Sequence, residues 1–242
     1  MSDQMIFKRY EIKYMLNREQ LERIKEGMVE HMITDEHGRS TICSLYFDTP
    51  DFLLARRSLE HPVYKEKLRL RSYGVTDDNS QVFVELKKKY QSVVYKRRVR
   101  MSSRKANDYL YKGKHPMNTQ ITREIDYAMK NYSGIRPAVL LSYEREAYYD
   151  KSNHEFRVTF DSNILWRDHN LTLGSGIYGE PLLEEDQFLM EVKTADAIPL
   201  WFVKLLNENH LYKTSFSKYG SAYETLCRNH RQEEARKVHL VG

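Results

Sequence analysis

The sequence predicts an α+β fold built on a closed antiparallel β-barrel, with helices packed outside it. Three consecutive segments, 63–73, 81–89 and 93–101, alternate charged and apolar side chains with the period of two that a β-strand gives. Helical patterns stand before and after them, and the apolar backs of the strands are the surface available for packing those helices. The charged faces of the strands would then point inward, into the lumen of the barrel.

The part of the chain before these strands predicts two more strands and two helices. Asn17 and Gln20 have the spacing of a helix capping box, so we expect a helix to begin there and to run to about residue 31. The apolar positions of this helix share one face: Leu21, Ile24 and Met28. The expected elements are, in order, a strand at 7–15, this helix, a strand at 42–47 and a short helix at 51–59.

The part after the three strands mixes helices and strands. Asp150, Ser152 and Asn153 form a turn signal, which predicts a hairpin between the strands on either side. The expected elements are helices at 103–111 and 120–132, strands at 136–149, 155–160, 164–167 and 187–194, and helices at 199–209 and 217–229. Polar residues after Arg231 predict a tail that frays. We therefore expect one domain over residues 1–230 and a polar tail over 231–242.

A glycine-rich stretch at 174–179 fits the pattern G-x-G-x-x-G, which occurs in dinucleotide-binding proteins. Pro181 follows it, and no strand–helix–strand unit surrounds it. We therefore interpret this stretch as a mobile loop and not as a dinucleotide site.

The composition indicates a globular protein of a reducing compartment. Hydrophobic residues make up 40% and charged residues 30% of the 242 residues. Cys43 and Cys227 lie far apart without C-x-x-C spacing, which predicts neither a disulfide scaffold nor a zinc site. There is no signal-peptide pattern and no apolar run that could span a bilayer. We expect a cytoplasmic protein without a membrane segment.

Nucleic acid is not an expected partner. The net charge of +5 is modest, and no aromatic-and-glycine motif of RNA-recognition type is present. The placement of the charges is therefore more informative than their sum.

Four strands each gather their charges on one face. The residues on these faces are Arg9, Glu11 and Lys13; Lys65, Lys67, Arg69 and Arg71; Phe83, Glu85, Lys87 and Lys89; and Lys96, Arg98 and Arg100. One such strand alone is most often a strand with a solvated charged face. Strands that face water normally interleave opposite charges, whereas these faces are mostly cationic. Burying unpaired ions costs several kcal/mol each, so the pattern favours a lumen neutralised by a polyanion such as polyphosphate. Arginine suits phosphate because its planar fork donates two parallel hydrogen bonds.

Nine short motifs occur in order along the chain. They are FKRYEIKY (7–14), SLYFDT (44–49), KLRLRSYG (67–74), ELK (85–87), YKRR (95–98), YER (143–145), RVTFD (157–161), MEVK (190–193) and FSKY (216–219). They are spread in order over nearly the whole chain and resemble the vacuolar transporter chaperone (VTC) domain of the triphosphate tunnel, or CYTH-like, superfamily. The resemblance implies a tunnel that binds nucleoside triphosphate and inorganic polyphosphate. In eukaryotic members the domain polymerises polyphosphate from ATP.

The resemblance also implies roles for particular residues. By position, the phosphate ligands would be Lys13, Arg69, Arg71, Lys87, Lys96, Arg98, Arg145, Arg157 and Lys218, with Tyr143 and Ser217 as neutral donors. Glu191 would be the main ligand of Mn²⁺ or Mg²⁺, and Glu11 and Glu85 would hold the waters of the metal. The catalytic group implied is Arg69, Arg71, Lys87, Arg145 and Glu191.

The implied activity is a phosphotransferase that moves the γ-phosphate of ATP, or of another nucleoside triphosphate, onto a polyphosphate chain. Arg9 stands where hydrolytic members carry the first Glu of an E-x-E-x-K motif, which favours the polymerase branch. We expect neither the regulatory helical domain nor the membrane-spanning domain of the eukaryotic proteins. Two alternatives stay open: a metal-dependent triphosphatase or polyphosphatase that uses water, and a non-catalytic polyphosphate- or nucleotide-binding module.

Overall fold

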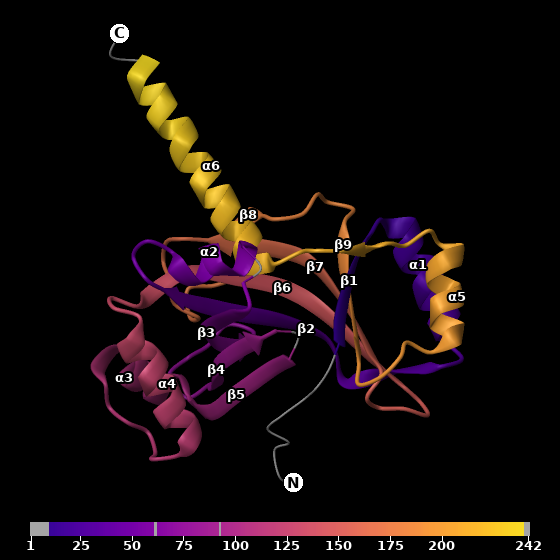
Figure 1. The fold of residues 1–242 in the computed structure, drawn as a ribbon, viewed down its shortest axis with the longest axis horizontal. Coiled ribbons are helices and arrows are strands. Elements are labelled where there is room, and N and C mark those ends of the chain that lie inside the picture. The colour runs from indigo at the N-terminus through magenta and orange to yellow at the C-terminus, as the bar shows by residue number, and fades with distance from the viewer. Residues whose placement is uncertain (1–9, 61, 92, 240–242) are drawn as a thin grey trace.

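The computed structural model describes residues 10–60, 62–91 and 93–239, which form one antiparallel sheet with helices around it (Figure 1). The strands are β1 (Tyr10–Leu16), β2 (Met32–Asp48), β3 (Tyr64–Tyr73), β4 (Gln81–Tyr90), β5 (Val93–Ser102), β6 (Arg136–Asp150), β7 (Arg157–Arg167), β8 (Glu180–Pro181), β9 (Phe188–Thr194) and β10 (Lys213–Thr214). The helices are α1 (Arg18–Met28), α2 (Leu53–Leu59), α3 (Ser103–Lys112), α4 (Gln120–Asn131), α5 (Leu200–Glu208) and α6 (Lys218–His239). The α+β class predicted from the sequence is confirmed.

The sheet is curled, but its hydrogen bonds do not close it into a barrel. The strand order is β10-β1-β9-β7-β6-β2-β3-β4-β5, with β8 paired to β7. Within the described residues, no ladder joins β5 back to β1 or β10, so the predicted closure is not seen. One physical reason is that β10 occupies the free edge of β1, where Thr214 pairs with Lys13. Side chains from both ends of the sheet nevertheless line one cavity.

Two strands differ in length from the expected ones. β2 begins at Met32, ten residues before the predicted start, because its polar first half pairs with the far end of β6. The two strands predicted at 155–160 and 164–167 form the single strand β7. Asn163 interrupts the pattern within β7, since it has a left-handed φ of 48° beside a register shift in the pairing with β6. The predicted hairpin between β6 and β7 is present.

The two ends of the chain also differ from expectation. The predicted first strand starts at residue 7, and residues 7–9 lie outside the described residues; β1 is described from Tyr10. The polar tail predicted after Arg231 is instead helical, because α6 continues to His239. The reason lies in the composition of this segment, in which Gln, Glu, Ala, Arg and Lys are strong helix formers.

The apolar backs of the strands are covered by two pairs of helices, as the alternating pattern predicts. Behind β2–β5, α3 and α4 bury a core that includes Leu68, Leu70 and Val84. Behind β1, β7 and β9, α1 and α5 bury a second core that includes Ile24 and Met28. The predicted capping box of α1 is present: Asn17 and Gln20 bond to each other's backbone N–H. These four helices lie on the outside of the sheet (Figure 1) and cover its apolar face, so the charged face is turned inward.

Two helices do not lie outside. α2 and the first turns of α6 pack on Tyr46, Val139 and Leu141, which face away from the outer core that contains Leu45 and Leu140. These helices therefore cover part of the inner face of the sheet. The rest of α6 projects far beyond it (Figure 1).

The glycine-rich stretch is a loop, as expected, and it is tied to the sheet. The side chain of Arg167 donates to the carbonyl oxygens of Gly176 and Tyr178, at 3.2 and 2.8 Å. Gly179 lies so close to the backbone of Trp166 that a Cβ atom there would stand 2.3 Å from the carbonyl oxygen. Only glycine fits that approach.

Among the described residues, no helix combines the length and apolar character that crossing a lipid bilayer requires.

Candidate functional site: a cationic cavity

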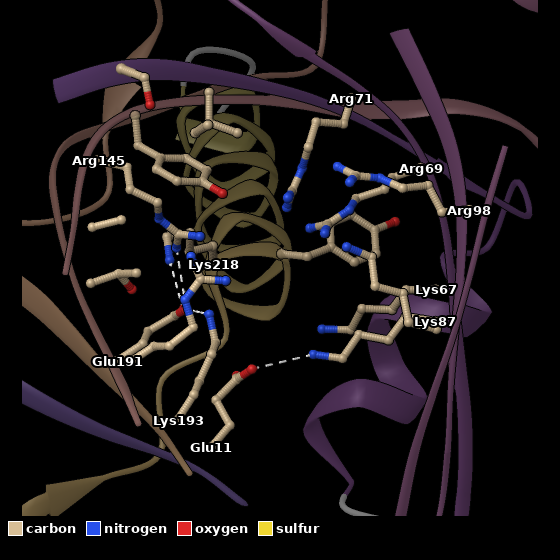
Figure 2. A pocket seen from close by; sticks show the side chains of 18 of the residues that line it. Glu11, Lys67, Arg69, Arg71, Lys87, Arg98, Arg145, Glu191, Lys193 and Lys218 are labelled. Atoms are coloured by element: carbon tan, nitrogen blue, oxygen red, sulfur yellow. Dashed lines mark hydrogen bonds and ion pairs between the residues drawn. The ribbon is translucent and has the colours of Figure 1, made fainter. Parts of the chain in front are cut away.

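The inner face of the sheet encloses a cavity of about 570 Å³. Its lining comes from β1–β7, β9, the start of α6 and one residue of α4, and includes eleven basic and three acidic side chains. The basic residues are Lys13, Lys67, Arg69, Arg71, Lys87, Lys96, Arg98, Arg145, Arg157, Lys193 and Lys218, and the acidic ones are Glu11, Asp35 and Glu191. Figure 2 shows two walls of these side chains facing each other. The excess of positive charge suits a ligand with many negative charges.

The first wall, on β3–β5, is built around one buried carboxylate. Glu85 is 1% exposed, and its Oε2 accepts from Arg69 Nε at 2.7 Å. Its Oε1 lies 2.9 Å from Lys96 Nζ and 3.0 Å from Arg98 Nε, and Arg71 Nε lies 3.7 Å from Oε2. Strand register explains this grouping, because Arg69, Glu85 and Arg98 are direct cross-strand neighbours. Glu85 thus holds four cations of the wall in fixed positions.

The second wall, on β6, β7, β9 and α6, contains two buried carboxylates. Arg145 makes a bidentate pair with Asp161, with both N···O distances 2.6 Å, and also reaches Glu191 at 3.2 Å. Lys218 lies 2.5 Å from Asp161 Oδ2 and 3.1 Å from Glu191 Oε1. Lys193 completes the wall at 3.2 Å from Glu191 Oε2. Asp161 is fully buried, so it acts as a permanent counter-ion beneath the cations.

One ion pair connects the two walls. Glu11 Oε2 on β1 lies 3.6 Å from Lys87 Nζ on β4 (Figure 2). Glu11 Oε1 also lies 3.6 Å from Lys13, whose Nζ donates to the carbonyl oxygen of Phe216 at 2.7 Å. The pair crosses the region that a ligand would fill.

Neutral donors line the cavity between the cations. Tyr46 on β2 accepts a hydrogen bond from Arg69 at 3.0 Å, and its ring stacks on Tyr219 with centroids 4.4 Å apart. Lys218 lies over the ring of Tyr143, with Nζ 4.7 Å from its centroid. Ser217 precedes α6, and its Oγ accepts from the backbone N–H of Gly220 at 3.1 Å. Hydroxyl groups at these places can donate to phosphate oxygens.

The cations set the protonation states of the carboxylates. Lys87 is the main cause that lowers the pKa of Glu11 to about 2, against the effect of burial. Burial alone would raise the pKa of Glu191, but Lys218, Lys193 and Arg145 lower it well below its usual range. Burial would likewise raise the pKa of Glu85, and Arg69 and Arg71 are the main groups that lower it. All three carboxylates are therefore ionised at neutral pH.

The pKa values of Lys96 on the first wall and of Tyr46 on β2 are also shifted. Burial lowers the pKa of Lys96 to about 7, although Glu85 acts in the opposite direction. Burial alone would raise the pKa of the Tyr46 hydroxyl, but Arg69 and Arg71 lower it below its usual range.

The three predicted metal ligands are not brought together. Among residues 10–60, 62–91 and 93–239, no group of three or more acidic, histidine or cysteine side chains is arranged to hold a metal ion. Glu11 and Glu191 lie on the paired strands β1 and β9, and the charge of Glu191 acts to raise the pKa of Glu11. Glu85 belongs to the first wall and is already engaged by four cations. The donors fit a divalent ion shared by one or two carboxylates and phosphate oxygens, not a site made of protein alone.

Of the fourteen site residues predicted from the sequence, thirteen line the cavity, and Glu85 lies directly beneath the lining. Sequence reasoning assigned no role to Lys67, Lys193, Asp161 or Tyr46. A signal existed for three of them: Lys67 belongs to the charged face predicted for residues 63–73, and Lys193 and Asp161 have the strand period of two from Glu191 and Arg157. Tyr46 could be found only from the packing of α2 and α6 on the inner face.

Comparisons with known proteins identify the family of the chain and agree with its fold. The family model of the VTC domain matches residues 8–227. Among solved structures, a proposed adenylyl cyclase from Hippeastrum with a dominant triphosphatase activity is similar, at a TM-score of 0.56 and 15% identity, covering 89% of this chain and 95% of that one. A proposed adenylate cyclase from Bacillus halodurans has a TM-score of 0.53 and 15% identity, covering 86% and 92%. At this identity both likenesses show the fold alone. No curated protein sequence matches the chain.

Proposed function

This chain belongs to the VTC domain family, and we propose that it transfers the γ-phosphate of ATP, or of another nucleoside triphosphate, onto a growing inorganic polyphosphate chain. The observation that carries the proposal is the lining of the cavity, with eleven basic and three acidic side chains. A polyanion of repeating charge is the ligand that neutralises such a lining along its whole length.

The transfer joins a terminal oxygen of the polyphosphate chain to the γ-phosphorus as the bond from that phosphorus to the β-phosphate oxygen breaks, and ADP leaves. The attacking oxygen is already ionised, so no general base is needed. The work of the protein is to align the two ends and to neutralise charge. Arg69 and Arg71 from one wall and Arg145 from the other would contact the transferring group from opposite sides.

The buried carboxylates make these cations rigid before the ligand binds. Arg145 donates through Nε and Nη2 to the two carboxylate oxygens of Asp161. Arg69 donates to Glu85 and to the hydroxyl of Tyr46. Positioned in this way, the guanidinium groups need little reorganisation during the transfer. Lys13, Lys96, Arg98, Arg157 and Lys218 extend the cationic surface to the rest of the chain of phosphates.

Glu11 and Glu191 are the residues that would hold Mn²⁺ or Mg²⁺ together with phosphate oxygens. When bound, such an ion supplies charge neutralisation at the phosphates. For Glu191 this competes with Arg145, Lys193 and Lys218, which already contact both of its oxygens. Phosphate can draw those cations away from Glu191, so phosphate and metal would bind together better than either alone.

The test is to incubate the purified protein with ATP and Mn²⁺ and to follow polyphosphate, free phosphate and nucleotide products separately. We expect one ADP to be released for each phosphate added to the polymer. We expect Arg69→Ala and Glu191→Ala to abolish both products. Arg18→Ala is the matched control, because Arg18 is an exposed arginine paired with Asp186 outside the cavity. Circular dichroism of each variant separates loss of activity from loss of fold.

A second candidate is a triphosphatase that uses water as the attacker. The observation in its favour is the fold shared with the Hippeastrum protein, which has a dominant triphosphatase activity. In the same experiment this candidate gives ADP and free phosphate without polymer. Binding of ATP or polyphosphate with neither product would favour a non-catalytic binding module instead.

A further inference from the structure

Lys67 differs from every other cation in the cavity lining. Its Nζ donates to Ser217 Oγ at 3.1 Å and points into the cavity (Figure 2). Each of the other ten basic residues of the lining has a carboxylate oxygen within 4.0 Å. Within the described part of the chain, Lys67 has none.

The groups that face Lys67 make a charged form costly in the free protein. The charged groups that act most on Lys67 are cationic, and they come from its own strand and from two others: Lys65 and Arg69 on β3, Lys87 on β4 and Lys13 on β1. Glu11 is the nearby carboxylate, and it pairs with Lys13 and Lys87. Lys87 is the direct cross-strand neighbour of Lys67. Burial first, and these four cations second, lower the pKa of Lys67 well below its usual range.

The partner of Lys67 is itself oriented. Ser217 Oγ accepts from the N–H of Gly220, so the serine stands at the N-terminal end of the long helix α6. The hydroxyl and the amine therefore form a polar spot with donors but no negative charge. A phosphate oxygen placed there would meet Lys67, Ser217 and the positive end of the helix together.

We propose that Lys67 and Ser217 form a phosphate subsite in which the bound polyphosphate supplies the missing counter-charge and Lys67 takes up one proton from solvent as the chain binds. The proposal rests on the proposed polyphosphate-binding function and adds to it a residue and a proton linkage. The only bond change is a proton transfer: the lone pair of Lys67 Nζ forms an N–H bond with a proton released by water or buffer, and the resulting ammonium ion pairs with a phosphate oxygen. Binding of the polyanion then becomes weaker as the pH rises.

The experiment is calorimetric titration of the full chain with tripolyphosphate, in EDTA, in two buffers of different ionisation enthalpy at the same pH. The difference between the two heats gives the number of protons taken up. Lys67→Arg keeps the positive charge but cannot be neutral at any pH used, so it should bind and take up about one proton fewer than the wild type. The titration of the ligand itself is the same for both proteins and cancels.

Lys65→Arg is the matched control, because Lys65 lies on the same strand but donates to the carbonyl oxygen of Ser58 and does not line the cavity. It should keep the proton uptake of the wild type. A second variant, Lys67→Met, removes an amine that must give up its proton when the free protein folds, which costs stability. Free Lys67→Met should therefore melt at a higher temperature than the wild type while binding tripolyphosphate more weakly.

Three results would count against these ideas in different ways. Equal proton uptake in the wild type and Lys67→Arg would overturn the subsite proposal alone. A lower melting temperature of free Lys67→Met would also overturn it, since Lys67 would then be a stabilising charge. If the wild type does not bind tripolyphosphate at all, the proposed function itself fails, and the subsite with it.

Discussion

Lys87 and Glu11 form an ion pair of 3.6 Å between β4 and β1, two strands that are not neighbours in the sheet. The backbone ladder that would close the barrel is absent between these ends of the described sheet, and side chains make the connection instead. A polyanion in the cavity would compete with Glu11 for Lys87. A ligand that breaks this ion pair would therefore also remove a contact between β1 and β4 across the cavity.

Glu11→Gln should increase the affinity for tripolyphosphate in the absence of metal. The substitution removes a carboxylate that engages Lys87 and Lys13 and that repels phosphate. We expect binding roughly tenfold tighter, equivalent to about 1.4 kcal/mol, by calorimetry in EDTA. Glu19→Gln, which alters an exposed pair with Arg23 on α1, is the control. Unchanged or weaker binding would contradict the competition between Glu11 and the ligand.

The stability of the free protein should fall on the acid side over a defined range. The pKa of Glu11 is lowered from its ordinary value of 4.5 to about 2, and those of Glu85, Asp161 and Glu191 are also lowered. A carboxyl with a lowered folded-state pKa contributes stability that is complete above the unfolded value and is lost as the pH falls through the folded value. The melting temperature should therefore decline from pH 4.5 towards pH 2.

The share of Glu11 in this decline can be isolated. Glu11→Gln has no carboxyl to protonate at that position, so its melting temperature should change less over the same range than that of the wild type. Parallel curves for the two proteins would show that Glu11 is not paired in solution.

Glu85→Gln should destabilise the free protein strongly. Its four neighbours, Arg69, Arg71, Lys96 and Arg98, would be left without their common counter-ion. Removing one side of a buried ionic group costs about 3–5 kcal/mol, measurable by urea unfolding. Glu19→Gln on the surface should change stability by less than about 0.5 kcal/mol.

Polyphosphate should partly restore the stability of Glu85→Gln. The ligand brings negative charge to the same four cations, and any ligand that binds only the folded state stabilises it. We expect the rise in melting temperature on adding tripolyphosphate to be larger for the variant than for the wild type. A smaller rise would mean that Glu85 organises the cations for binding more than it neutralises them.

Tyr219→Phe should cost about 1–3 kcal/mol of stability. The Tyr219 hydroxyl donates to Asp48 at 2.6 Å, and Asp48 is fully buried. Asp48 also accepts from the backbone N–H groups of Leu54 and Ala55, which fixes the first turn of α2. Urea unfolding measures the change, and Tyr212→Phe, at an 80% exposed tyrosine, should behave as the wild type.

The strands and the cationic faces could be predicted from the sequence because a strand has a strict period of two. Lys67, Arg69 and Arg71 alternate with Leu68 and Leu70, and no other regular structure separates these residues so cleanly. Once the leucines are buried under helices, the basic side chains must share the opposite face. The predicted lining follows from this local rule combined with the family resemblance.

Features that depend on distant residues could not be predicted in this way. The edge of β1 is taken by β10, a two-residue strand with no pattern of its own. The role of Glu85 depends on three strands in register, and the isolation of Lys67 depends on where all the other carboxylates lie. Asn163 joins two apparent strands into one by a single left-handed residue. Each of these is a property of the assembled sheet.

The long helix α6 has its root in the cavity wall, at Lys218, and extends 22 residues to His239. At 1.5 Å per residue it is about 33 Å long, and most of it stands clear of the sheet (Figure 1). Because its first residues line the cavity, a rotation of about 10° at the root would move the far end by about 6 Å. A small adjustment of Lys218 on a phosphate would therefore be amplified into a displacement large enough to be read at a distance from the cavity.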